Sequence, residues 1–276
     1  MTRRYLGPNM PETLFGSLAS VTIDRLRAFE PADGYWLAFS GGKDSVVLYD
    51  LAVASGVKFD AHYSVPPPDP PEVKAFVRKY YPSVQRIYPK KNVLLLARKH
   101  GMLPSRIVRW CCAEWKETGG NGRTILTGIR AEESARRAAR KMVEACYRKP
   151  GTRFVHPLMD WMTEDVWQYI RSHSLPTCSL YAEGQKRVGC VLCPMTRNVE
   201  PQIQRWPGIA RMWRAMAEVA WQAATQRGRE RCDFPNAESY WRWWLDRDAS
   251  PPTDKMPLWD DTPMASACGD QQEGGA

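Results

Sequence analysis

The sequence predicts an α/β fold: a Rossmann-like, mainly parallel sheet followed by a helical C-terminal cap. Short apolar runs alternate with stretches whose apolar residues have helical spacing, a pattern typical of strand–helix–strand units. The expected strands are residues 35–40, 59–65, 84–88, 124–129 and 154–158. The expected helices are residues 44–54, 72–81, 92–99 and 163–172, the last with Thr163 as its N-cap. From about residue 200 the pattern becomes helical and rich in tryptophan and arginine.

We divide the chain into four consecutive segments. Residues 1–34 are an N-terminal helical leader, and residues 35–199 are the main α/β domain. Residues 200–249 form the helical cap, and residues 250–276 are expected to be a disordered tail because they contain few large apolar residues. Crossovers between parallel strands are right-handed, so the residues that follow the strands should face one crevice.

The composition is that of a globular protein. Hydrophobic residues make up 43% of the 276 residues and charged residues 25%, which excludes a collagen, a coiled-coil rod and a wholly disordered chain. The net charge of +9 favours an anionic partner such as a nucleotide, a nucleic acid or a sulfated small molecule. We find neither a secretory signal nor an apolar run of 18 residues, so we expect a cytoplasmic protein without a membrane span.

The string SGGKDS lies between the first expected strand and its helix. Glycines let backbone N–H groups approach a phosphate, and the start of a helix adds unpaired donors with a partial positive charge. Lys43 adds a cation, and Asp44 could hold Mg2+ or fix the loop. The pattern GxxxxGK[ST] does not fit, so this is not a Walker A loop, and a plain tight turn is the alternative. The anion site would consist of Ser40, Gly41, Gly42, Lys43, Asp44 and Ser45.

A second basic signature, TGIRAEESARR, spans residues 127–137. Arg130 lies one residue beyond an expected strand, where a guanidinium can grip phosphate or sulfate with paired hydrogen bonds. We expect Gly128, Arg136 and Arg137 to line the same nucleotide site, with a solvated basic helix face as the alternative. The residues to which we assign the chemistry are Lys43, Asp44 and Arg130.

Four cysteines form two pairs that are distant in sequence. Cys111 and Cys112 are adjacent, and Cys190 and Cys193 form a Cys-x-x-Cys pair that begins 78 residues after Cys112. Two thiolate pairs from distant segments can make a four-sulfur site. Spacing alone does not separate an iron–sulfur cluster from zinc, a disulfide or unligated thiols. Basic residues that could offset the charge of a thiolate-bound cluster flank both pairs: Arg106, Arg109, Lys116 and Arg187.

SGGKDS resembles the PP-loop of the ATP pyrophosphatase superfamily, whose members bind ATP in an α/β sheet. With WCCAEWKETGGNGR, TGIRAEESARR, PLMDWMTEDVWQYI and LYAEGQKRVGCVLCPM in the same order, the chain is similar to the phosphoadenosine phosphosulfate reductase family over about residues 35–215. The similarity is greatest to phage and bacterial members. Residues 35–199 would then be a PP-loop nucleotide-binding domain that also carries an iron–sulfur site.

The resemblance also implies a ligand set. In the adenylyl-sulfate reductases of this family, a Cys-Cys pair and a Cys-x-x-Cys pair bind one 4Fe–4S cluster. Carried over, the ligands are Cys111, Cys112, Cys190 and Cys193. Lys116 matches a lysine near that cluster, and Tyr181 and Arg187 match the segment that leads into the second pair.

Two chemistries follow from the resemblance. The family as a whole implies reduction of phosphoadenylyl sulfate to sulfite, with a thiol or another electron donor. The intact SGGKDS is instead like that of ATP-cleaving members, which implies ATP-dependent, pyrophosphate-releasing sulfur transfer to a nucleic acid or a small molecule, as in the sulfur-transfer component of DNA phosphorothioation. Mg2+ would then neutralise the leaving group.

The nucleophilic thiol of the reductases is only partly matched. They use a cysteine in a Glu-Cys-Gly context followed by His, whereas Cys268 here has Ala267 before Cys-Gly and Asp270 after it. Nearby acidic residues do not lower the pKa of a thiol. Cys178 is another candidate, although a packed small side chain is the better interpretation of that position.

Tryptophans alternate with arginines in the expected cap. Such a surface could stack bases and contact phosphates, or it could be a core covered by arginine stems. Trp206, Trp213 and Trp221 are spaced by seven and eight residues on one helical face, so we expect packing. A nucleic-acid-binding module without catalysis is the third functional class left open. The sulfur acceptor, the electron donor and a homo-oligomeric state are also left open.

Overall fold

The computed structural model describes residues 12–13, 16–147, 149–227, 234–247 and 249. It divides into two compact units, each made of segments that are separate in sequence. Unit 1 comprises Met1–Val65, Pro71–Ile87 and Thr118–Val188, and unit 2 comprises Pro66–Pro70, Tyr88–Glu117 and Gly189–Ala276. This division differs from the consecutive segments expected from the sequence, because the part around Cys111 belongs with the C-terminal helices. The expected tail, 250–276, lies outside the described residues.

Unit 1 contains a six-stranded sheet in the order β5–β4–β3–β6–β8–β7. Neighbouring strands are parallel except β7, which pairs antiparallel with β8 at the edge. Leu37 on β3 is fully buried and pairs with Ala61 on β4 and Leu126 on β6. The predicted mainly parallel sheet is therefore confirmed. Its strands are β3 (Tyr35–Ala38), β4 (Phe59–Ser64), β5 (Gln85–Ile87), β6 (Thr124–Leu126), β7 (Val143–Ala145) and β8 (Arg153–Val155).

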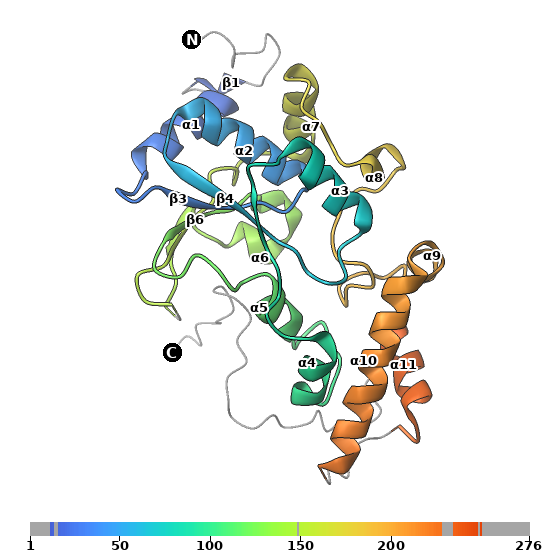
Figure 1. The fold of residues 1–276 in the computed structure, drawn as a ribbon. Helices are drawn as coiled ribbons and strands as arrows, with labels where there is room; N and C mark the ends of the chain where they lie inside the picture. Colours follow the sequence, from blue (N-terminus) through green and yellow to red (C-terminus); the bar gives the residue numbers. More distant parts are fainter. Residues whose placement is uncertain (1–11, 14–15, 148, 228–233, 248, 250–276) are drawn as a thin grey trace. The chain divides into compact units, whose positions relative to one another are not determined.

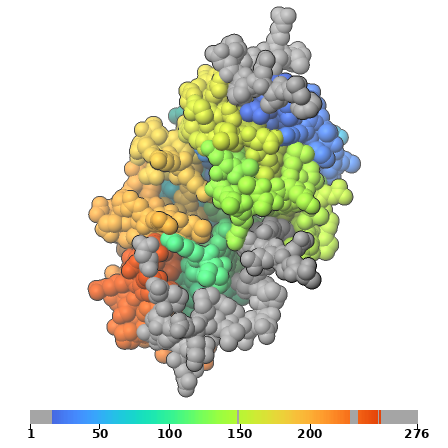
Figure 2. Space-filling view, turned by 180° about the vertical axis from the view of Figure 1, so that it is seen from behind, coloured from blue at the N-terminus to red at the C-terminus, as the bar shows by residue number. Residues whose placement is uncertain are grey.

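The helices of unit 1 cover this sheet. Helix α1 packs on α2, and α2 packs on α7, so these three lie together (Figure 1). From behind, the yellow residues of α7 lie beside the lime-green segment that contains β7 and β8 (Figure 2). A short antiparallel pair, β1 (Glu12–Thr13) and β2 (Gly16–Ser17), precedes α1. The helices are α1 (Leu18–Ala28), α2 (Lys43–Ser55), α3 (Pro71–Tyr80), α6 (Ala135–Ala138), α7 (Thr163–Ser172) and α8 (Ser179–Ala182), with a 3-10 turn at Ala131–Glu133.

Helix α7 has the predicted bounds but a different cap. Met162 is the N-cap residue, with an extended backbone, and its N–H donates to the Asp165 carboxylate over 2.8 Å. The prediction that Thr163 is the N-cap is wrong, because Thr163 is the first helical residue. Its N–H and hydroxyl both donate to Glu132, over 2.6 and 2.8 Å. The helix start is thus tied to the turn that follows β6.

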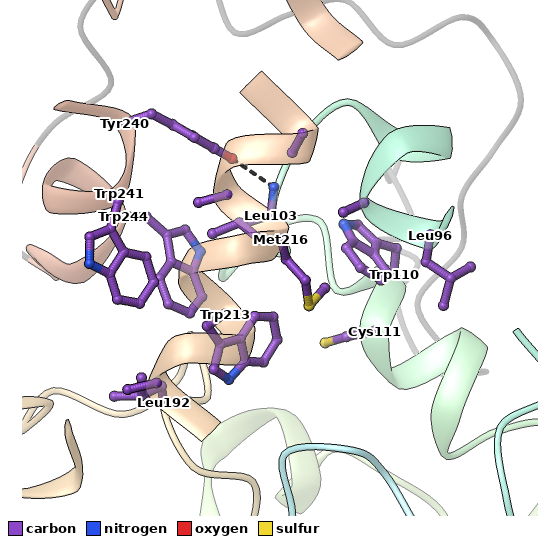
Figure 3. Packing of buried hydrophobic residues seen from close by; sticks show 14 of the residues in the cluster. Leu96, Leu103, Trp110, Cys111, Leu192, Trp213, Met216, Tyr240, Trp241 and Trp244 are labelled. Carbon is purple, nitrogen blue, oxygen red and sulfur yellow. Dashed lines mark hydrogen bonds between the residues drawn. The ribbon is translucent and has the colours of Figure 1, made fainter. Parts of the chain in front are cut away.

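Unit 2 is helical. Its long helix α10 (Pro207–Gln226) packs on α4 (Val93–His100) and on α11 (Ala237–Leu245). The remaining helices are α5 (Trp110–Trp115) and α9 (Glu200–Arg205). Their apolar faces form one core in which tryptophan rings meet edge to face or tilted, as aromatic pairs prefer. Figure 3 shows this core with Cys111 among Trp110, Trp213 and Met216.

Several polar atoms of this aromatic core have partners, whereas the buried indole N–H of Trp115 has none among the described residues. Trp213 donates its indole N–H to the Val191 carbonyl over 3.1 Å, and Trp244 donates to the Pro104 carbonyl over 2.8 Å. The Leu103 N–H donates to the Tyr240 hydroxyl over 2.6 Å (Figure 3). The expectation that the helical tryptophans pack is confirmed for Trp213, which is buried. Within the described residues, no helix is long and apolar enough to cross a bilayer.

Candidate functional site

The SGGKDS loop of unit 1 joins β3 to α2. Gly41 has a φ of 71°, in the left-handed region that favours glycine. A methyl group added there would lie 3.0 and 3.1 Å from the Val73 and Val77 side chains of α3. Both the backbone shape and the close approach of α3 therefore require glycine at this position.

The two serines of the loop stabilise it through hydrogen bonds within the loop. The Ser45 hydroxyl donates to the Gly42 carbonyl over 2.8 Å. The Ser40 N–H and the Ser40 hydroxyl both donate to the Ser45 oxygen over 3.2 Å. The loop is thus held in one shape at the start of α2, the place where backbone N–H groups and the helix dipole favour an anion.

Asp44 lies between two cations. The Lys43 ammonium is 2.9 Å from one of its oxygens, and the Arg130 guanidinium Nε is 2.7 Å from the other. Gly128 passes closely beside this residue, because a methyl group added at Gly128 would lie 3.1 Å from the Asp44 backbone carbon. The structure therefore brings together Lys43, Asp44, Gly128 and Arg130, which come from two separate sequence motifs.

Arg130 itself is buried, with 2% of its surface exposed. Besides Asp44, its guanidinium donates to Glu132 over 2.6 Å and to the Thr163 hydroxyl over 3.2 Å. It also donates to the Trp161 carbonyl over 3.2 Å. Burial opposes the charged form, but Asp44 and Glu132 raise the pKa of Arg130 above its usual value. This arrangement differs from the expected phosphate grip, because the guanidinium is engaged with protein groups that fix Asp44.

The other predicted basic residues lie further along the same motif. Arg136 is exposed, and Arg137 forms an ion pair with Glu133, four residues before it. Both belong to the short helix α6. The structure places Asp44 in ion pairs with Lys43 and Arg130 instead.

The two cysteine pairs both belong to unit 2. Cys111 and Cys112 lie on α5, while Cys190 and Cys193 belong to a turn in which the Cys193 N–H donates to the Cys190 carbonyl over 3.3 Å. Leu192, inside this turn, has a φ of 55°, a conformation that side-chain-bearing residues adopt infrequently. Charges on Cys190 and Cys193 both raise the pKa of Cys111, so the two pairs lie within electrostatic range of each other.

Cations and one carboxylate surround these sulfurs. Arg109 donates to the Cys112 sulfur over 3.4 Å, and Lys116 donates to the Cys190 sulfur while part of its side chain reaches solvent. Asp69, which is buried, lies 3.4 Å from the Cys190 sulfur. The surrounding protein opposes the charge of Lys116, but Cys190, Asp69 and Cys112 raise its pKa above the usual value. Lys116 and Arg109 were expected from their place beside the cysteines, whereas no sequence pattern points to Asp69, which lies in a proline-rich stretch.

The pKa values of the adjacent cysteines are shifted in opposite directions. A hydrogen bond from Cys111 and the Arg109 charge lower the pKa of Cys112 to about 5, against the effect of burial. The same hydrogen bond, together with burial, raises the pKa of Cys111 above its usual value. Burial raises the pKa of Cys190 to about 12, and Lys116 opposes this rise. A thiolate is the form that binds metal, and Arg109 favours that form at Cys112.

These residues fit a thiolate-bound inorganic centre in charge and in ligand chemistry. Four sulfurs from two segments are the ligand set of an iron–sulfur cluster or of a zinc ion. Lys116 and Arg109 offset the charge that such a centre would bring. In the described part of the chain, no group of three or more histidine, cysteine, aspartate or glutamate side chains is arranged to hold a single metal ion.

The candidate nucleophiles are not equally placed. Cys178 is buried at the start of α8, and burial raises the pKa of its thiol above the usual value, so it is a poor thiolate. Cys268 lies outside the described residues.

Comparison with known proteins identifies the family. The family model described as phosphoadenosine phosphosulfate reductase domain matches residues 34–196. The chain belongs to this family. Its relatives include an uncharacterised 37.8 kDa protein of Escherichia phage 186, 32% identical over 122 residues, which cover 39% of this chain and 36% of that protein. They also include an adenosine 5'-phosphosulfate reductase of Bacillus cereus, 30% identical over 142 residues, which cover 48% of this chain and 60% of that enzyme.

The matches to these relatives are partial. The chain covers between about a third and three fifths of the length of these two proteins. Among solved structures, the phosphoadenylyl-sulfate reductase of Candida auris in a phosphate complex superposes with a TM-score of 0.45 and 18% sequence identity. That match covers 66% of this chain and 98% of the other.

Proposed function

We propose that this chain is an adenine-nucleotide-binding enzyme of sulfur metabolism that reduces a sulfonucleotide, phosphoadenylyl sulfate or adenylyl sulfate, to sulfite. The observation that carries the proposal is the braced SGGKDS loop at the start of α2, in a chain of the phosphoadenosine phosphosulfate reductase family. A loop of this kind favours an oxyanion, and the substrate of the reaction carries a phosphosulfate.

Residues of the loop would bind the substrate's oxyanions. The N–H groups of Gly42 and Lys43 lie where the chain enters α2, and Lys43 adds a positive charge beside them. Asp44 keeps the Lys43 ammonium in place, and Arg130 keeps Asp44 in place. In this proposal Ser40–Ser45 positions the phosphosulfate, and Arg130 acts through Asp44 rather than by direct contact.

The proposed reaction uses two thiols as reductant. A thiolate attacks the sulfur of the phosphosulfate, forms an S–S bond and breaks the S–O bond, so that the adenosine phosphate leaves with the bonding electrons. A second thiol, from a donor such as a dithiol protein, attacks the sulfur of the first thiol. Sulfite then leaves and a disulfide remains, so two thiols lose two electrons in total. Cys268 and Cys178 are the candidates for the first thiol.

Cys111, Cys112, Cys190 and Cys193 would hold a 4Fe–4S cluster in unit 2. When bound, this group would supply a charged inorganic centre that cross-links α5 to the turn of Cys190. Lys116 would donate to the Cys190 sulfur and offset the charge, and Asp69 would orient Lys116. Such surrounding residues tune the centre that the ligands hold.

The test is product identification under anaerobic conditions. Purified protein is incubated with phosphoadenylyl sulfate or adenylyl sulfate and dithiothreitol, and sulfite and adenosine phosphate are quantified. We expect equal amounts of the two products. One of the two variants, Cys268→Ser or Cys178→Ser, should lose both products, and that variant identifies the nucleophile. Absence of sulfite with either substrate would overturn the reductase proposal.

The arrangement of Asp44 supports a second candidate function, ATP-dependent sulfur transfer with release of pyrophosphate. Its carboxylate, at the start of α2, is a hard oxygen ligand suited to Mg2+. This candidate predicts pyrophosphate release from ATP, abolished in Asp44→Ala. If neither sulfite nor pyrophosphate forms, the remaining candidate is a nucleic-acid-binding module, which would show a steep dependence of binding on salt.

A further inference from the structure

Tyr181 reaches the start of α2 from a different part of unit 1. It lies on α8, and its hydroxyl oxygen accepts the Lys43 N–H over 2.9 Å. A methyl group added at Gly42 would lie 3.6 Å from the same oxygen. The tyrosine oxygen therefore lies at the backbone donors of the SGGKDS loop.

A second backbone group donates to this oxygen. The Val188 N–H also hydrogen-bonds to the Tyr181 hydroxyl, so two backbone N–H groups converge on one oxygen atom. This is the pattern in which a phosphate oxygen is bound at a helix start. Burial, with a contribution from the Asp44 charge, raises the pKa of Tyr181 to about 12, so the phenol is neutral at physiological pH.

Tyr181 also makes contacts within the segment that leads to Val188. The Gly184 N–H donates to the Tyr181 carbonyl over 3.1 Å, and the Tyr181 ring meets Trp167 edge to face at 5.1 Å. Residues 182–187 are exposed. We call residues 179–188 the Tyr181 segment; it ends two residues before Cys190 in the sequence.

We propose that a phosphate or phosphosulfate oxygen of the bound nucleotide displaces the Tyr181 hydroxyl from the Lys43 N–H, and that nucleotide binding thereby releases the Tyr181 segment from the loop. The proposal rests on the proposed function in one respect, that the nucleotide's oxyanions bind at Ser40–Ser45. It adds that Tyr181 competes with them for one donor, which makes Tyr181 a positioning residue and not a catalytic one.

The direction of the exchange follows from charge. An ionised oxygen accepts a backbone N–H roughly twice as strongly as a neutral oxygen does, and the positive end of the α2 dipole adds to that preference. The neutral phenol of Tyr181 therefore yields to an oxyanion. The Val188 N–H loses its acceptor when the hydroxyl leaves, so this amide becomes available to solvent.

The experiment compares Tyr181→Phe with the wild type, using inorganic pyrophosphate and adenylyl sulfate as probes in calorimetric titrations. Phenylalanine keeps the ring against Trp167 but removes the competing oxygen. We expect Tyr181→Phe to bind both probes about fivefold more tightly, the change that corresponds to one neutral hydrogen bond. The matched control is Tyr49→Phe, because the Tyr49 hydroxyl contacts Ser83 and lies outside the loop's hydrogen bonds. Its affinity should equal that of the wild type.

Hydrogen exchange gives an independent readout. Peptides that span residues 179–189 should exchange faster when pyrophosphate is added to the wild type, and in Tyr181→Phe they should be fast with or without it. Equal or weaker binding by Tyr181→Phe, or slower exchange of this segment with pyrophosphate, would overturn the proposal while leaving the proposed function intact. Failure of the wild type to bind either probe would overturn both.

Discussion

Arg130 offers the clearest test of how unit 1 organises its loop. The perturbation is Arg130→Met, which keeps an unbranched stem but removes the end of the guanidinium, the charge and all the N–H donors. Arg130 is 2% exposed and hydrogen-bonds to Asp44, Glu132, Thr163 and the Trp161 carbonyl. Its loss would leave the partly buried carboxylates of Asp44 and Glu132 without this partner.

The expected magnitude follows from that environment. Removing one member of a buried ion pair costs about 3 to 5 kcal/mol, because the other charge stays behind without its partner. Asp44 and Glu132 are partly exposed, so we take the lower end, about 3 kcal/mol. For a unit of this size that corresponds to a midpoint of thermal unfolding lower by roughly 6 to 12 °C.

The assay is thermal unfolding followed by circular dichroism, with pyrophosphate binding measured in parallel. The control is Arg171→Met, because Arg171 pairs with Glu164 at a site where both side chains are largely exposed. That change should shift the midpoint by no more than about 2 °C. The reasoning would be refuted if Arg130→Met had the same unfolding midpoint as Arg171→Met while its affinity for pyrophosphate fell tenfold or more. Arg130 would then bind the ligand directly and would not act through Asp44.

Three further changes test other parts of the structure. Gly41→Ala should destabilise the protein more than Gly56→Ala in urea unfolding. Both glycines have positive φ, but an added methyl group would contact other side chains, those of Val73 and Val77, only at Gly41. Equal losses of unfolding free energy would refute the close approach of α3. Tyr240→Phe should cost about 1 to 3 kcal/mol in the same assay, since it leaves the buried Leu103 N–H without its acceptor; a neutral result would contradict that hydrogen bond. Asp60→Asn tests a pH dependence. Burial opposes the charge of Asp60, but hydrogen bonds and charges from Arg123 and His62 lower its pKa below the usual value. The stabilisation is therefore complete above the unfolded pKa of about 3.9 and is lost as pH falls through the folded value. The difference in unfolding free energy between wild type and Asp60→Asn should thus persist from pH 7 to about pH 5 and shrink below about pH 4; a difference that grows on acidification would contradict this pairing.

Most strands and helices of unit 1 could be predicted from the sequence, because within each element the apolar residues follow either the strand period or the helix period. The stretch that forms α7 was found to the residue, and β3 and β4 to within two residues. The edge strand β7 was missed, since Val143–Ala145 has a charged residue at its centre and lies in a stretch rich in arginine and lysine rather than in an apolar run. The division into units was also missed. It depends on α10 packing against α4, a contact between distant segments that no local pattern reveals.

The sequence predicts the residues of the candidate sites but not the contacts that they make with one another. Glycine pairs and cysteine spacings are local patterns, so the sequence alone predicts Ser40–Ser45 and the four cysteines as site residues. The protein partners of Arg130 were not predicted, because Asp44 and Thr163 lie 86 and 33 residues away in the sequence. Tyr181 was found only as part of a matching segment. Its contact with Lys43 spans 138 residues, and no sequence period connects them.

The most direct test of the proposed four-sulfur centre is iron and acid-labile sulfide analysis of the anaerobically purified protein, beside Cys190→Ser and Cys178→Ser. We predict about four iron and four sulfide per chain in the wild type and in Cys178→Ser, and a large loss in Cys190→Ser. Iron near zero with one zinc per chain would contradict the cluster assignment, and so would full iron content in Cys190→Ser.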